Sequence, residues 1–307
     1  MVTDLLDEPI GRAREVELLR ATLDSGAHVV LEGPPGTGKS TLLRAVAASQ
    51  DVAFLFVEGN AELTPARLVG HFDPARVLAD GYIEEIFVDG PLIAALRSGG
   101  LLYVEELNRV PEETLNVLIT VMSEGELHVP RLGKVEAAKG FRLVAAMNPF
   151  DAVGTARISA AVYDRTCRIA MGYQPAADED AIVVRQALAV PDEWRGKVVE
   201  LTRRTRAHPD VRIGSSVRGS IDMTRLAGSL AAARDVPVTD WHVGLDAALV
   251  ALSGRIRLAE SGSRSSEALV RELYEGVFGP PPAHEDQTRD GDPPGEAPAR
   301  RRRAANP

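Results

Sequence analysis

The sequence has little cysteine and no long hydrophobic run. Its single cysteine, Cys167, excludes an intramolecular disulfide among the 307 residues and fits a reducing compartment. Because Cys167 lies in a strand-like stretch, we expect a buried core thiol rather than a reactive nucleophile. No apolar run approaches the ~18 residues of a membrane-spanning helix, and the acidic N-terminus lacks the apolar segment of a signal peptide. These absences predict a cytoplasmic protein without a membrane span.

An excess of basic residues is also missing. The formal net charge is −9 and the pI is about 5.3, whereas a dedicated nucleic-acid binder usually has a basic surface. The hydrophobic content of 45% and the charged content of 26% are those of an ordinary globular protein. We therefore expect a packed core and no dedicated nucleic-acid partner. The length allows one large domain or two moderate ones.

The first part of the chain alternates strand-like and helix-like segments. Apolar stretches rich in β-branched and aromatic residues are typical of strands buried on both faces. A helix-like segment lies between the first two of these stretches, and another begins at Pro111. This alternation predicts an α/β domain over residues 1–175 with a doubly wound, mostly parallel sheet. The expected strands are at residues 27–33, 52–59, 99–106, 141–149 and 166–173.

The pattern changes after this domain. Residues 176–279 read as successive helices without convincing strands, which predicts a smaller all-α lid domain. Residues 280–307 are rich in proline, glycine and charge, so we expect a disordered tail. The four arginines at 300–303 could contact an acidic surface or remain solvated. Their role is left open.

A phosphate-binding motif, "GPPGTGKST", follows the first expected strand and precedes a helix. It matches G-x-x-x-x-G-K-[ST], in which glycines let backbone N–H groups point at a phosphate and the helix dipole adds to the field. Lys39 would reach the β- and γ-phosphates of ATP, and the Ser40 hydroxyl would bind Mg²⁺. The alternative is a glycine-rich turn that matches by chance. The predicted nucleotide-binding residues are Gly33, Pro34, Pro35, Gly36, Thr37, Gly38, Lys39, Ser40 and Thr41.

Polar side chains stand at the tips of two further strands. In "LLYVEELNRV" a buried strand leads into Glu105 and Glu106, and burying unpaired carboxylates is unfavourable without a cation, proton or substrate nearby. Beside the phosphate loop, Glu105 would help to hold Mg²⁺ and Glu106 would act as general base on the attacking water. Asn148 ends another strand and could position the same water or contact the γ-phosphate. The alternatives are two solvated acids and a turn-forming asparagine before Pro149.

The motifs together resemble the MoxR branch of AAA+ ATPases over roughly residues 8 to 262. The resemblance implies that Arg165, in an Asp-Arg pair, is the arginine finger, with Arg157 as the competing candidate. It also implies that Arg218 is the sensor-2 arginine. The family usually has aspartate at the position of Glu105, and the extra methylene leaves open whether hydrolysis is slowed. The segments that carry the resemblance are "IGRAREVELL", "LVGHFDP", "DGPLIAAL", "EELNRVPEETLNVLITVMSEGEL", "MNPFDAVGT", "GTARISAAVYDRT" and "GSSVRGS".

The resemblance implies an Mg²⁺-dependent ATP hydrolase that works as a ring oligomer, a hexamer in this interpretation. Such a ring would remodel a protein client or assist its metal or cofactor insertion, with a von Willebrand factor A domain protein as partner. Residues 126–143 read as a β-hairpin, with or without a role in gripping a partner. Two other functions remain open, namely a non-hydrolysing ATP-binding switch and a P-loop kinase or DNA motor. The client, the pathway and the ring size are not identified by the sequence.

Overall fold

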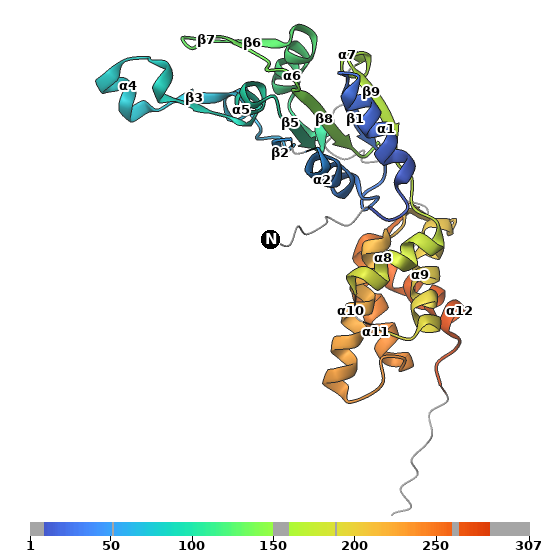
Figure 1. Cartoon of the computed structure of the whole chain (residues 1–307). Helices are drawn as coiled ribbons and strands as arrows, with labels where there is room; N and C mark the ends of the chain where they lie inside the picture. Colours follow the sequence, from blue (N-terminus) through green and yellow to red (C-terminus); the bar gives the residue numbers. More distant parts are fainter. Residues whose placement is uncertain (1–8, 51, 150–159, 188, 260–263, 283–307) are drawn as a thin grey trace, which may run out of the picture.

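A computed structural model describes residues 9–50, 52–149, 160–187, 189–259 and 264–282 (Figure 1). Three sequence predictions lie outside these residues. They are the alternative finger Arg157, most of the tail, and the arginine cluster at 300–303.

The first part of the chain is built on a sheet of five strands in the order β2-β5-β8-β1-β9. Every neighbouring pair is parallel. Each strand falls within one of the predicted ranges, and the predicted doubly wound parallel sheet is confirmed. The strands are β1 (His28–Glu32), β2 (Phe54–Glu58), β5 (Leu101–Glu105), β8 (Arg142–Met147) and β9 (Thr166–Ala170).

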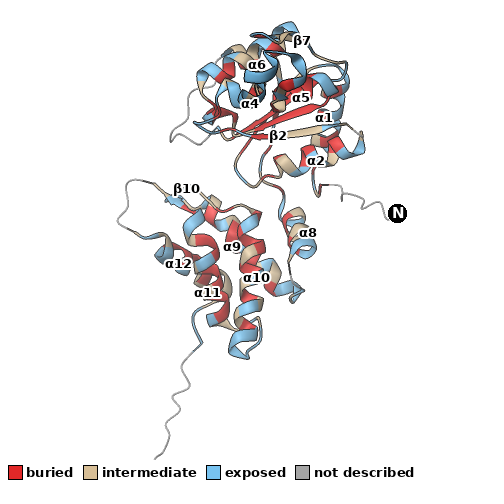
Figure 2. Cartoon of the chain, turned by 90° about the vertical axis from the view of Figure 1, so that its left-hand side faces the viewer, coloured by how far each residue is buried: buried red, intermediate tan, exposed pale blue. Residues whose placement is uncertain are grey.

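Helices cover both faces of this sheet, because successive side chains of a strand point to opposite faces. Val29 and Leu31 of β1 pack in one core with helices α1 and α2, whereas Val30 packs in the other core with α5 and α6. Figure 2 shows the buried layer in red between the helices. The covering helices are α1 (Ala13–Asp24), α2 (Lys39–Ser49), α5 (Pro91–Ser98) and α6 (Glu112–Glu124).

Two of the strands are less buried than the sequence predicts, because β2 and β9 form the edges of the sheet. Phe56 of β2 is 42% exposed and lies under the guanidinium of Arg44, whose Cζ is 5.7 Å from the ring centroid. Cys167 of β9 is exposed, so the prediction of a buried core thiol is wrong. An apolar run predicts a strand, but its place in the sheet decides how far it is buried.

Two extensions project from the sheet on the same side in Figure 1. One is the predicted hairpin, in which β6 (Glu126–Val129) pairs with β7 (Gly133–Glu136) in antiparallel register. The other is an arm that the sequence analysis did not predict. Arg131 of the hairpin turn joins the two, since its Cζ lies 3.7 Å from the ring centroid of Tyr82. The arm contains α3 (Pro65–Val69), β3 (Gly70–Phe72), α4 (Pro74–Asp80), η1 (Glu84–Ile86) and β4 (Phe87–Asp89).

The second part of the chain is helical and has its own core, centred on Trp194, Met223 and Tyr274. Two short strands, β10 (Val211–Ile213) and β11 (Arg257–Leu258), pair antiparallel beside the helices and were not predicted. No helix in the described ranges has the length and apolar character that crossing a bilayer requires. The short helix η3 (Ser253–Arg255) lies between α11 and β11. The α-helices are α8 (Ala176–Gln186), α9 (Asp192–Ala207), α10 (Val217–Arg234), α11 (Trp241–Leu252) and α12 (Ser266–Phe278).

Candidate nucleotide site

The phosphate-binding motif forms the turn between β1 and α2, and three of its glycines are required there. Gly36 and Gly38 have φ angles of +74° and +84°, in the left-handed region that favours glycine. A Cβ at Gly33 would lie 2.0 Å from the carbonyl oxygen of Met171, so no other residue fits. The loop therefore has the sharp backbone turn that a phosphate cradle needs.

Lys39 is folded back onto this loop. Its buried Nζ donates hydrogen bonds to the carbonyl oxygens of Gly33, at 2.7 Å, and Pro34, at 2.9 Å. The pKa of Lys39 is lowered to about 8, mainly by burial and in smaller part by the positive charge of Arg218, while the negative charge of Glu105 opposes the shift. The ammonium group is thus held inside the loop with less solvation than in water, which favours an anionic partner.

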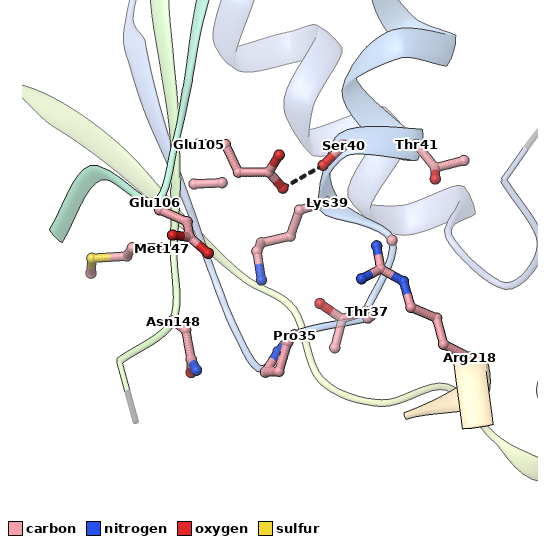
Figure 3. A pocket seen from close by; sticks show the side chains of 13 residues that line it. Pro35, Thr37, Lys39, Ser40, Thr41, Glu105, Glu106, Met147, Asn148 and Arg218 are labelled. Atoms are coloured by element: carbon pink, nitrogen blue, oxygen red, sulfur yellow. Dashed lines mark hydrogen bonds between the residues drawn. The ribbon is translucent and has the colours of Figure 1, made fainter. Parts of the chain in front are cut away.

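Ser40 and Glu105 come from different elements and are joined directly. The Ser40 hydroxyl donates to Oε1 of Glu105 at 2.7 Å, as the dashed line in Figure 3 marks. The phenol oxygen of Tyr103 lies 3.2 Å from the same hydroxyl, and burial raises the pKa of Tyr103, which keeps the phenol protonated. A hydroxyl and a carboxylate oxygen at this separation are hard donors of the kind that Mg²⁺ prefers. The residues therefore fit a magnesium ion.

Glu106 lies just beyond the tip of β5 in an unusual conformation. Its φ is +53°, and it leads into the short helix η2 (Leu107–Arg109). The turn is fixed from β2, because Gly59 donates its N–H to the Glu105 carbonyl at 2.7 Å and a Cβ at Gly59 would lie 2.5 Å from the Glu106 carbonyl. The Glu106 carboxylate forms an ion pair with Arg109, with 3.0 Å between Oε2 and Nη1. The left-handed turn directs this carboxylate toward the phosphate loop (Figure 3).

A cavity of about 140 Å³ brings most of the predicted residues together. Asn148 lies on its wall one residue after β8, and Arg218 enters from the first turn of α10 (Figure 3). The segment before α10 contacts the loop closely here, since a Cβ at Gly36 would lie 2.2 Å from the Ser216 hydroxyl. Of the predicted residues, those that line the cavity are Pro35, Gly36, Thr37, Gly38, Lys39, Ser40, Thr41, Glu105, Glu106, Asn148 and Arg218.

Arg165 is not brought to this cavity. It follows α7 (Ala160–Asp164), and its guanidinium donates to the Ser123 hydroxyl and to the Ala161 carbonyl. The next residue, Thr166, pairs with His28, the first residue of β1, whereas the phosphate loop follows the last residue of that strand. The two ends of a strand of this length are roughly 13 Å apart. Arg165 therefore lies at the amino-terminal end of the strands, whereas its own phosphate loop lies at their carboxyl-terminal end.

The sequence analysis assigned no role to Arg12, although the segment "IGRAREVELL" contains it. Its buried guanidinium donates to the carbonyl oxygens of Thr37, at 2.8 Å, and Gly172, at 2.6 Å. Arg12 thus ties the phosphate loop to the segment that follows β9. The only signal was the "GR" pair before the first helix, and nothing in its spacing indicates these two distant carbonyl groups.

Comparisons with known proteins agree with this geometry. The family model for the AAA domain, dynein-related subfamily, matches residues 28–166. Gas vesicle ATPase GvpN of Haloferax mediterranei is 30% identical over 213 residues, which are 64% of this chain and 61% of that protein, so the match spans less than two thirds of its length. An uncharacterized protein of Staphylococcus aureus is 30% identical over 189 residues, 61% of this chain and 71% of that protein.

A solved structure with the same fold is RuvB of Thermotoga maritima, described as a Holliday junction branch migration motor. The TM-score is 0.54 at 16% identity, and the match covers 80% of this chain and 73% of that one. At this identity the likeness concerns the fold, a parallel sheet with a helical region after it. The chain therefore carries an AAA domain of the dynein-related subfamily over residues 28–166, whose phosphate loop and acidic strand tip meet Arg218 in one cavity.

Proposed function

We propose that this protein is an Mg²⁺-dependent ATP hydrolase of the MoxR type. The observation that carries the proposal is the cavity where Lys39, the Ser40–Glu105 pair, Glu106 and Arg218 meet. Phosphoryl transfer uses four kinds of group, and all four meet here: a cation that binds phosphate, oxygen atoms that bind a metal, a carboxylate that activates water, and a second cation.

In this proposal the loop N–H groups and Lys39 bind the β- and γ-phosphates. The Lys39 ammonium already faces the loop, and its hydrogen bonds to two neutral carbonyl oxygens would be exchanged for bonds to phosphate oxygens that carry negative charge. Ser40 and Glu105 would hold Mg²⁺, which supplies neutralisation of phosphate charge when bound. Their 2.7 Å contact supports this assignment.

Glu106 would take the proton of the attacking water, and Asn148 would orient that water. Both side chains line the cavity. They stand at the carboxyl ends of β5 and β8, which are neighbouring parallel strands and therefore end on the same side of the sheet. Arg218 would contact the γ-phosphate from the lid. We retain the division into a nucleotide-binding domain, residues 1–175, and a lid, residues 176–279, as part of this proposal.

Arg165 would act on the ATP of a neighbouring subunit. Its position at the opposite end of the strands from its own phosphate loop supports action in trans, which requires a neighbouring subunit, and head-to-tail contacts between subunits can close into a ring. A ring, a hexamer by the MoxR resemblance, provides that arrangement. Hydrolysis at each interface would then depend on assembly.

The biological role proposed for the ring is to remodel a protein client or to assist its metal or cofactor insertion, with a von Willebrand factor A domain protein as partner. A DNA motor is less well supported, because the net charge is −9 and the likeness to RuvB concerns the fold alone. The name of the relative gas vesicle ATPase supports nucleotide hydrolysis over a passive switch. We also retain a cytoplasmic location as a proposal.

Phosphate release with saturating ATP and Mg²⁺ tests the proposed function. Wild type should turn over, Glu106→Gln should bind ATP but lose at least about 100-fold in rate, and Lys39→Ala should lose binding. A wild-type protein that binds ATP without releasing phosphate, alone or at high concentration, would instead be the non-hydrolysing switch. Transfer of the phosphate to an added acceptor rather than to water would identify a kinase.

A further inference from the structure

A buried carboxylate outside the site is held by two arginines. Glu179 of α8 is only 1% exposed. Its Oε1 accepts from Nη1 of Arg206 at 2.6 Å, and its Oε2 accepts from Nη1 of Arg203 at 3.2 Å. Both arginines belong to α9. A buried carboxylate is unfavourable unless it is paired and hydrogen-bonded, and here each oxygen has its own arginine.

Each of these arginines also reaches beyond the two helices. Arg206 donates from Nε to the Ser215 carbonyl, and its Cζ lies 4.0 Å from the ring centroid of Tyr173. Arg203 donates to the Gln174 carbonyl at 3.0 Å. Tyr173 and Gln174 belong to the connection between β9 and α8, the passage from sheet to lid. One carboxylate therefore orients contacts to this connection and to the segment that precedes α10.

The segment before α10 is the part of the lid that meets the phosphate loop. The N–H of Ser215 donates to the Thr205 hydroxyl at 2.9 Å, so α9 holds Ser215 through both its N–H and its carbonyl. The next residue, Ser216, packs against Gly36 of the loop. Arg218 follows after one further residue and enters the cavity. A shift of Ser215 would therefore move Arg218 relative to the phosphates.

We propose that Glu179 is a positioning residue that, by orienting Arg206, sets the place of Arg218 against the phosphate loop. The proposal rests on the function proposed above, in which Arg218 contacts the γ-phosphate. It predicts that Glu179 affects the preference for a triphosphate over a diphosphate nucleotide, although Glu179 itself does not line the cavity.

The neighbouring ion pair supplies a matched control. Asp180 accepts two hydrogen bonds from Arg195, at 2.7 and 3.0 Å, and this pair also joins α8 to α9. Within the part of the chain that the structure describes, Arg195 otherwise donates only to Asp192 of its own helix. Asp180→Asn thus removes a carboxylate between the same two helices without a contact to Ser215 or to the connection.

The experiment measures dissociation constants of AMP-PNP and ADP, with Mg²⁺, by calorimetry on full-length variants. Arg218→Ala should reduce the preference for AMP-PNP by about tenfold, the effect of one charge-assisted hydrogen bond. Glu179→Gln should reduce it in the same direction, and the double variant should fall no further than Arg218→Ala alone. Asp180→Asn should lower the melting temperature and leave the preference unchanged.

A second variant keeps the test decisive where Glu179→Gln fails to fold. Arg206→Lys retains a positive charge for Glu179 but lacks the planar fork whose Nε and Nη1 reach Ser215 and Glu179 from two separate nitrogens, so it should show the same loss of preference. A wild-type preference in either folded variant, or a loss that adds to that of Arg218→Ala, overturns the proposal. Wild-type protein that binds neither nucleotide would instead refute the function on which it rests.

Discussion

Glu106 and Arg109 form an ion pair across the turn that follows β5, with 3.0 Å between Oε2 and Nη1. Both side chains are more than 40% exposed, and exposed pairs of this kind contribute only about 0.2–1 kcal/mol. The pair can therefore open at little cost when a nucleotide and water enter the cavity. In the proposed mechanism the ion pair keeps the Glu106 carboxylate bound to Arg109 until a nucleotide and water are present.

Arg109→Ala should therefore raise basal phosphate release, by at most about fivefold, because 1.4 kcal/mol corresponds to tenfold in rate. Steady-state hydrolysis at saturating ATP measures this change. Arg76→Ala is the control, since it removes a similar exposed pair with Asp80 on α4, outside the cavity lining. A loss of more than tenfold in Arg109→Ala would mean that Arg109 takes part in the reaction.

The Ser40–Glu105 contact leads to a prediction about magnesium. Glu105→Gln should raise the Mg²⁺ concentration that supports half-maximal ATP turnover by about tenfold or more, because a carboxylate ligand is lost. Glu105→Asp keeps the charge and should retain the wild-type Mg²⁺ requirement or lower it. If Glu105→Gln abolishes turnover at all Mg²⁺ concentrations while Glu106→Gln turns over normally, the two roles are reversed.

The pKa of Lys39 predicts a pH dependence of stability in the nucleotide-free protein. Burial lowers this pKa from 10.5 to about 8, so between these values the unfolded chain binds more protons than the native one. The free energy of unfolding should therefore rise with pH from about 8 to 10.5, by an amount of the order of 3 kcal/mol. Lys39→Met should lack this rise in urea unfolding series.

The comparison of wild type with Lys39→Met at each pH cancels the contributions of all other groups. Lys39→Met should be at least as stable as wild type at pH 7, because the lysine side chain binds phosphate and does not contribute to the hydrophobic core. Parallel stability curves for the two proteins across this pH range would show that Lys39 is not held as a buried cation. ATP affinity close to wild type in Lys39→Met would refute the phosphate-cradle assignment.

Action of Arg165 in trans predicts complementation between inactive variants. Arg165→Ala and Glu106→Gln should each be nearly inactive, since an arginine finger contributes ~10³–10⁵ in rate. When the two variants are mixed under conditions that allow subunits to exchange, activity should return. An Arg165→Ala subunit keeps its own Glu106 and receives Arg165 from a Glu106→Gln neighbour. With random mixing roughly a quarter of the interfaces of a closed ring would be intact.

The same mixture distinguishes the alternatives. If Arg165 acts within its own subunit, no interface contains a complete site and the mixture stays inactive. If Arg165→Ala alone turns over normally, the finger is elsewhere, and the mixing experiment would be repeated with Arg157→Ala. The matched control is Arg168→Ala, because Arg168 is a nearby exposed arginine on β9 that pairs with Glu32.

The sequence predicted features that depend on a few consecutive residues. The glycines of the phosphate loop and of the hairpin turn allow the backbone angles that they adopt, and the two acids stand at the tip of an apolar run, so their neighbours along the chain suffice. The family resemblance added Arg218, which no local pattern would have connected with a loop far away in sequence. The structure then places Arg218 on the cavity wall.

Features that depend on distant partners were not predictable. Cys167 looked like a core residue because an apolar strand says nothing about whether it lies at the centre or the edge of a sheet. The arm around α4 was missed because this helix has no buried residue in the described structure and hence no apolar face to read. Glu179 stands in the first turn of a helix, where acids are common, so the sequence assigned it no role, and its burial against Arg203 and Arg206 is known only from the structure.

The position of β1 in the sheet has a consequence for folding. Val29 pairs with Val144 on one side and with Cys167 on the other, so the strand that supports the phosphate loop is completed only by segments made much later in synthesis. Pairings so distant in sequence form slowly and late. Nucleotide binding during refolding should consequently appear with the final kinetic phase, which makes a fluorescent ATP analogue a reporter of the completed sheet rather than of the loop alone.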